Sequence, residues 1–185
     1  MENKFLDKIT TSLSAEFPVA DSMDRFLDVI IPKIRPWGED LYEEHFYVGK
    51  AWLEIRDDET FHTSVLHFFN EGGEYLKSVD GDITSGSWRY MDGSNKFLIG
   101  EGNRDGELFD LSFLDGQFFI LSKHGDQERM GQRKYFVMVV ENVGKGLEAR
   151  EVMERLFNKY RNNSGLFITI MLIILVIIAI FFILY

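Results

Sequence analysis

The chain contains no cysteine, and this absence excludes several classes of function at once. Without cysteine there is no disulfide, no thiol nucleophile and no cysteine-ligated zinc site. Basic residues are also outnumbered, because 20 Lys and Arg stand against 30 Asp and Glu, which gives a net charge of −10. Proteins bind nucleic-acid polymers through a basic surface that contacts the phosphates, so this balance argues against a nucleic acid as a partner.

Sequence patterns typical of catalysis and of metal binding are missing as well. The chain has no G-x-S-x-G motif and no Ser/His/Asp arrangement that would indicate nucleophilic catalysis. His62 and His67 fall in one expected strand at an odd spacing, so their side chains point to opposite faces and cannot share a metal. The acidic run from Asp80 lacks the Gly and the Glu that a calcium loop needs. We therefore expect no enzymatic activity, no cofactor and no metal site.

Charge is absent from residues 166–185, which also contain no Pro and no Gly. Twenty helical residues with a rise of about 1.5 Å each extend about 30 Å, which matches the hydrocarbon core of a bilayer. Buried helices of soluble proteins are usually shorter and interrupted by polar residues, so that alternative fits this segment less well. The pattern predicts one C-terminal transmembrane helix that anchors the chain in a membrane.

The orientation of this anchor follows from the charges beside it. Five basic residues precede the segment: Lys145, Arg150, Arg155, Lys159 and Arg161. Basic residues that flank a span stay on the cytoplasmic side of the membrane. The first residues, MENKFLDKITTSL, lack the apolar core of a secretory signal. We expect a tail-anchored protein whose remaining residues lie in the cytoplasm.

The N-terminal segment, residues 1–45, has helical periodicity. Apolar residues recur at helical spacing over 3–15. A second helix is predicted after an N-cap at Asp21 or Ser22, and Pro32 should end or kink it. These helices either cover the domain that follows or bind a protein partner, and the sequence leaves both interpretations open.

Residues 46–143 have a different pattern, in which short aromatic and β-branched runs alternate with Gly, Asp and Asn turns. Eight strands are predicted, at 46–55, 61–70, 74–79, 85–91, 96–100, 108–114, 117–122 and 134–141. No segment between them is long enough for a crossover helix, so the fold class is mainly β, an antiparallel up-and-down barrel. The pair Asp115-Gly116 between apolar strands predicts a type I′ turn, with positive φ at both residues.

The side-chain pattern within these strands indicates how the barrel is covered. Alternation places Phe109, Leu111 and Phe113 on one face of their strand. The strands over 117–122 and 134–141 are apolar on both faces, so their outer faces need a cover, and the N-terminal helices are the obvious candidates. Residues 144–165 read as a juxtamembrane helix that leads to the anchor.

The order GKAWLEI, VLHFFNEGGEYL, SGSWRYMDGSNKFLIGEG and ELFDLSFLDGQFFILSK resembles the small bacterial lipocalin-like domains. The matching positions are Gly49, Trp52, Phe68, Gly73, Tyr75, Gly86, Trp88 and Leu98. The chain departs from that family's G-x-W pattern, because two residues separate Gly49 from Trp52. It also lacks the N-terminal lipid signal of exported members. The resemblance implies a closed or half-open barrel with a binding role and no catalytic residues.

Two features of the sequence are candidates for ligand binding. The first is the barrel interior, lined by Trp52, Trp88, Tyr90, Phe97 and Phe109, which is either hollow enough for an apolar ligand or filled as a core. The second is the loop SKHGDQERMGQRKY, where Arg129, Arg133 and Lys134 form a basic spot on an acidic chain. That spot would bind an anionic ligand, face anionic lipid, or serve only as a solvated hairpin end.

These observations lead to one principal hypothesis and two alternatives. The principal hypothesis is a non-enzymatic, membrane-tethered barrel that faces the cytoplasm and acts as a binding or scaffolding module. The first alternative is a membrane effector switched by a small ligand, since a minimal barrel joined to a span looks like the sensors of some cyclic-nucleotide antiphage systems. The second alternative is a tethered binder of lipid or fatty acid.

Overall fold

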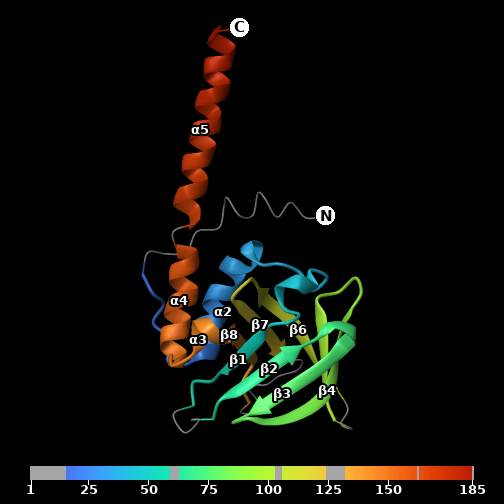
Figure 1. Cartoon of the computed structure of the whole chain (residues 1–185). Helices are drawn as coiled ribbons and strands as arrows, with labels where there is room; N and C mark the ends of the chain where they lie inside the picture. Colours follow the sequence, from blue (N-terminus) through green and yellow to red (C-terminus); the bar gives the residue numbers. More distant parts are fainter. Residues whose placement is uncertain (1–15, 59–62, 103–105, 124–131, 162, 185) are drawn as a thin grey trace.

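The architecture is a closed barrel of eight antiparallel strands in sequence order, with β8 pairing back to β1 (Figure 1). The computed structural model describes residues 16–58, 63–102, 106–123, 132–161 and 163–184. The strands are β1 Ala51–Ile55, β2 Val65–Phe69, β3 Glu74–Val79, β4 Asp82–Met91, β5 Lys96–Glu101, β6 Glu107–Leu114, β7 Phe118–Lys123 and β8 Tyr135–Val140. The predicted up-and-down barrel is confirmed, and its strand order is consistent with a lipocalin-like fold.

The first strand begins later than predicted, at Ala51 rather than at residue 46. Residues Glu44–Phe46 form a short 3₁₀ turn, η2, instead of extended chain. Gly49 has a φ of 73°, a left-handed conformation that a side chain would disfavour and that cannot continue a strand. The segment between η2 and β1 is therefore free to fold inward, where it fills part of the barrel.

The turn prediction at Asp115-Gly116 is wrong, because neither residue is among those with a positive φ. The Asp115 carboxylate instead accepts hydrogen bonds from the backbone N–H groups of Gln117 and Phe118, at 2.6 and 2.7 Å. This local bond gives the chain an alternative way to turn. The two-residue turn with positive φ joins β3 to β4, where Asp80 has a φ of 49° and Gly81 of 99°.

The two main helices on the barrel are α2 Met23–Ile34 and α4 Ala149–Arg161. The hydroxyl of Ser22 accepts a hydrogen bond from the backbone N–H of Arg25 at 3.3 Å, which confirms the predicted N-cap. Pro32 does not end α2, since the helix continues to Ile34 and is followed by a 3₁₀ turn, η1 Arg35–Trp37. The predicted helix over 3–15 lies outside the described residues.

Both helices pack on the outside of the barrel, which confirms that its doubly apolar strands are covered. Two further short helical segments are η3 Glu71–Gly73 and α3 Glu141–Gly144. The buried residues of this outer layer are Met23, Phe26, Leu27, Ile30, Ile31 and Ile34 of α2, Val152, Met153, Leu156, Phe157 and Tyr160 of α4, and Ile55, Phe113, Phe118, Ile120, Tyr135, Val137 and Val139 of the strands. The helix predicted to lead to the anchor corresponds to α4, which also forms part of the core.

Phe113 belongs to this outer layer, so the prediction that it shares a face with Phe109 and Leu111 is wrong. The pairing of β6 with β7 shifts register between Leu111 and Phe113. A bulge of this kind inserts one residue and reverses the direction of every side chain after it. Phe109 and Leu111 point into the barrel, whereas Phe113 packs under the helices.

The last helix, α5 Asn163–Leu184, follows α4 and extends away from the barrel (Figure 1). Its described side chains are almost all apolar and exposed, and they include Ile170, Met171, Leu172, Ile173, Ile174, Leu175, Val176, Ile177, Ile178, Ile180 and Phe181. None of the helices in the described residues is long and apolar enough to cross a membrane. The membrane span expected at 166–185 thus stays a prediction.

Candidate functional site

The interior of the barrel has two halves of opposite character, and the half nearest η2 is filled with aromatic rings. Tyr47, which follows η2, is completely buried there, with its ring centroid 5.3 Å from those of Trp88 and Phe119 and 5.5 Å from that of Phe97. Its hydroxyl donates to the carbonyl of Leu41 at 2.9 Å, so the polar tip of the ring is satisfied. This half of the interior is packed core.

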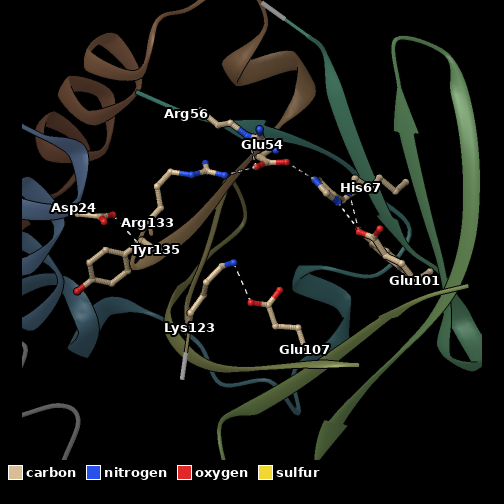
Figure 2. Close-up of polar contacts among 11 residues, drawn as sticks. Asp24, Glu54, Arg56, His67, Glu101, Glu107, Lys123, Arg133 and Tyr135 are labelled. Atoms are coloured by element: carbon tan, nitrogen blue, oxygen red, sulfur yellow. Dashed lines mark hydrogen bonds and ion pairs between the residues drawn. The ribbon is translucent and has the colours of Figure 1, made fainter. Parts of the chain in front are cut away.

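The other half of the interior is polar and open, and we call it the mouth pocket. It has a volume of about 290 Å³. Its lining residues are Glu54, Arg56, His67, Tyr75, Lys77, Ile99, Glu101, Glu107, Phe109, Lys123, Arg133, Tyr135 and Phe136. Residues in or next to β1 to β3 and β5 to β8 line the pocket, so it is formed by the barrel as a whole. Figure 2 shows polar contacts among its residues.

Ion pairs connect different strands around the wall of the mouth pocket. Lys77 of β3 lies 2.8 Å from the Glu101 carboxylate of β5. Lys123 of β7 lies 3.0 Å from the Glu107 carboxylate of β6 (Figure 2). These four side chains are between about one quarter and one half exposed, so water reaches them and each pair contributes at most about 1 kcal/mol to stability.

Glu54 of β1 is the central acceptor of the mouth pocket, and only 3% of its side chain is exposed. Its carboxylate lies 2.6 Å from Nε of Arg56, 3.2 Å from Nε2 of His67 and 3.4 Å from Nη2 of Arg133. Burial alone would raise the pKa of this carboxyl group. The hydrogen bonds from His67 and Arg56 and the positive charge of Arg56 outweigh burial and lower the pKa of Glu54 to about 2.

A buried relay connects Glu54 with Tyr75 through the ring of His67. Nδ1 of His67 lies 2.6 Å from the Tyr75 hydroxyl, and Nε2 faces Glu54. Burial raises the pKa of Tyr75, so its hydroxyl keeps its proton at neutral pH and is able to donate. The ionised Glu54 can only accept, so the proton of a neutral imidazole belongs on Nε2 and Nδ1 accepts from Tyr75. The relay therefore fixes ring orientation and supplies no activated nucleophile.

Arg133 lines the mouth pocket, and the two residues that follow it in the chain contact the outer helix α2. The carboxylate of Asp24 accepts hydrogen bonds from the backbone N–H groups of Lys134 and Tyr135, at 2.7 and 3.3 Å. The ammonium of Lys134 pairs with Asp28, also on α2. Burial opposes ionisation of Asp28, but its bonds with Lys134 and Tyr135 lower its pKa below the ordinary value. The segment that carries Arg133, directly before β8, is thus held to α2 by charged contacts.

The residues that the sequence predicts to bind a ligand do not lie in one site. Trp52, Trp88 and Phe97 lie in the packed aromatic half of the interior. Tyr90 lines a separate shallow pocket near Asn95. Lys134 faces α2, and Arg129 lies outside the described residues. Phe109 and Arg133 line the mouth pocket together.

Most residues of the mouth pocket were not candidates on the basis of the sequence. Each of them lies two positions along its strand from an aromatic or aliphatic side chain that points into the barrel, so it faces inward as well. These residues are Glu54, His67, Lys77, Glu101 and Lys123. A polar residue at the end of an inward stripe, repeated in strand after strand, is the signal that identifies them.

No protein-family model, no curated protein and no solved structure matches the chain. Within the described ranges, no group of three or more His, Asp or Glu side chains is arranged to hold a metal ion.

Proposed function

We propose that this chain is a membrane-tethered binding module that holds a small polar ligand in the mouth pocket of its barrel. The observation that carries the proposal is the pocket itself, about 290 Å³ in volume and lined by charged side chains from most of the strands. Ligand sites are typically concave, largely preformed, and equipped with a few fixed polar groups. The relay of Tyr75, His67 and Glu54 and the cross-strand ion pairs provide such fixed groups.

The character of the interior favours a polar ligand over a fatty acid. A fatty-acid binder needs a long apolar cavity, whereas the apolar half of this interior is occupied by rings such as Tyr47, Phe69 and Phe119. These rings lie 5.2 to 6.4 Å from their neighbours, which is ordinary aromatic packing distance. The resemblance to lipocalin-like domains is compatible with this assignment, since it implies a binding role.

The membrane tether is proposed from the uncharged segment 166–185, which overlaps α5. The basic residues before it favour a cytoplasmic location for the barrel. The turn at Asp115 contacts the end of α4 through Lys159 and Tyr160, and the mouth pocket lies at the opposite end of the strands. A barrel tethered through α5 would therefore present its mouth pocket away from the membrane.

Two charges in the middle of the tail should release the protein from the membrane. A Lys near the centre of a span costs about 2.5 to 3.5 kcal/mol, so Ile174→Lys combined with Ile177→Lys should prevent stable insertion. We expect the wild type to resist extraction by alkaline carbonate and the double variant to appear in the soluble fraction. Ile174→Ala with Ile177→Ala is the matched control and should stay in the membrane. A wild type that is fully extracted would contradict the tether.

Filling the mouth pocket with a large side chain should abolish ligand retention. Glu107 lies at the rim, with 52% of its side chain exposed, so Glu107→Trp should occlude the pocket without disturbing the buried network around Glu54. We expect a small molecule to co-purify with the full-length wild type and to be missing from this variant, as measured by mass spectrometry of the denatured protein. Glu148→Trp, at an exposed position directly before α4, provides the control. Equal retention by all three proteins would place any ligand outside the mouth pocket.

A ligand-responsive membrane effector is a second candidate, and one arrangement favours it. Asp24 of α2 holds the backbone beside Arg133, α2 packs against α4, and α5 follows α4. A change at the mouth pocket thus has a continuous packed route to α4, which α5 follows. Hydrogen exchange of α4 that changes on addition of the co-purified ligand would favour the effector. A change in hydrogen exchange that is confined to the barrel strands would favour a simple binding module.

A further inference from the structure

The charged groups of the mouth pocket do not cancel. Four cations line the pocket, which are Arg56, Lys77, Lys123 and Arg133, and three carboxylates face them, which are Glu54, Glu101 and Glu107. The described wall therefore carries one more positive than negative side chain, on a chain with a net charge of −10. A local reversal of the overall sign at a concave site raises the local concentration of anions.

The excess positive charge is assigned to Arg133 by the distances. Lys77 and Lys123 have their own carboxylates at 2.8 and 3.0 Å, and Arg56 lies 2.6 Å from Glu54. Arg133 shares that same Glu54 through the longest of these contacts, 3.4 Å. Figure 2 shows its guanidinium group directed at Glu54 across the pocket.

The hydrogen bonds of Arg133 lead to the same assignment. Its Nη1 is the one buried side-chain nitrogen or oxygen in the described part of the chain that has no hydrogen-bond partner. A buried donor without an acceptor is unfavourable, and an incoming acceptor would relieve this cost. The Arg133 side chain is 37% exposed, so a small rotation brings its planar fork to a ligand in the pocket.

Three apolar side chains also line the mouth pocket, beside the rings of His67, Tyr75 and Tyr135. Ile99 and Phe109 are 7% and 3% exposed, and the ring of Phe136 lies 5.7 Å from that of Phe109. Together they form a surface suited to the hydrocarbon part of a small molecule. A ligand that uses both walls needs one acidic group and a compact apolar body.

We infer that the mouth pocket binds a small organic monoanion, with its acidic group on Arg133 and its apolar body against Ile99, Phe109 and Phe136. This inference rests on the proposed function and narrows its ligand class. One excess positive charge matches a carboxylate or another singly charged group better than a dianion. The mouth pocket lies at the end of the barrel that is far from the junction of α4 with α5. A membrane around α5 would therefore be distant from the pocket, which favours a free small molecule over a lipid headgroup.

The test compares charged and neutral probes of the same shape on the full-length protein in detergent. Benzoate and benzamide form one matched pair, and isobutyrate and isobutyramide form a second pair with an aliphatic body. Binding is followed by NMR, through the side-chain Nε–H signal of Arg133 and the ring signals of His67. We expect each anion to bind about tenfold more tightly than its amide, because a charge-assisted bond to Arg is replaced by a neutral contact.

Variants of Arg133 test whether this residue causes the preference for the anion over the amide. Arg133→Gln should reduce the preference for the anion to about onefold, while Arg150→Gln, on the exposed face of α4, should leave it unchanged. Arg133→Lys keeps the charge and should retain part of the preference. Equal binding of anion and amide in the wild type would overturn the monoanion and leave the mouth pocket as a binding site. No binding of any probe would overturn the monoanion and the proposed function together.

Discussion

Replacement of Glu54 by alanine is expected to destabilise the barrel by about 3 to 5 kcal/mol, since removal of one partner leaves buried charged groups uncompensated. The carboxylate of Glu54 is the shared acceptor of Arg56, His67 and Arg133, and its side chain is 3% exposed. Chemical denaturation of the full-length protein, followed by near-ultraviolet circular dichroism, measures the loss. A loss below about 1 kcal/mol would show that the network around Glu54 contributes no more than a surface contact.

The contribution of Glu54 should also depend on pH in a defined direction. Its pKa is about 2 in the folded protein, against an ordinary value of 4.5, so folding favours the ionised form. The stabilisation is therefore fully present above pH 4.5 and is lost as the pH falls through 2, and a lowering of this size corresponds to about 3 kcal/mol.

Glu54→Gln isolates this effect, because it removes the charge while keeping the shape of the side chain. The difference in unfolding free energy between wild type and Glu54→Gln should be constant from pH 7 to 5. It should then shrink steadily between pH 4.5 and 2. A difference that does not change over this lower range would contradict the lowered pKa of Glu54.

Replacement of Asp115 by alanine should have the other large effect, again about 3 to 5 kcal/mol, because this one buried carboxylate satisfies four donors. Two are the backbone N–H groups of the β6–β7 turn, at Gln117 and Phe118. The other two belong to α4, where Nζ of Lys159 lies 2.8 Å away and the hydroxyl of Tyr160 also donates. Burial raises the pKa of Tyr160, so this hydroxyl remains a donor at neutral pH.

The effect of Asp115→Ala should be concentrated where α4 meets the barrel. Asp115→Asn keeps an acceptor for the turn but loses the charge that Lys159 faces. We therefore expect the Asp115→Asn protein to be destabilised less than the Asp115→Ala protein. Tyr160→Phe removes a single donor and should cost about 1 kcal/mol. Hydrogen exchange should show faster exchange in α4 for Asp115→Ala than for Tyr160→Phe. Unchanged exchange in α4 would mean that Asp115 stabilises the turn alone.

The barrel itself could be predicted from the sequence because its signals are local. Short alternating runs bounded by Gly, Asp and Asn specify strands and turns one at a time, and the N-cap at Ser22 is a similarly local pattern. The strand positions were accordingly close to those observed. The errors fall where a distant contact decides the conformation. Tyr47 leaves the expected strand to fill the barrel, and the bulge after Leu111 turns Phe113 outward.

The candidate site was less predictable, because its residues are separated in sequence and each is unremarkable on its own. Asp115, for example, looked like one half of a tight turn, and its bonds with α4 depend on how the helix docks. Lys134 looked equivalent to Arg133, yet one side chain pairs with Asp28 on the outer helix and the other enters the mouth pocket. Both residues directly precede β8, and their different contacts in the folded chain decide which cation reaches a ligand.

Native mass spectrometry of the full-length protein, released from detergent, tests the central claim most directly, because it records bound mass on the intact chain. We expect a reproducible small adduct, on the order of a few hundred daltons, on the wild type. The adduct should be missing from Glu107→Trp and still present on the tail variant with Lys at positions 174 and 177. A wild type that carries no adduct, or an adduct that persists when the mouth pocket is filled, would contradict it.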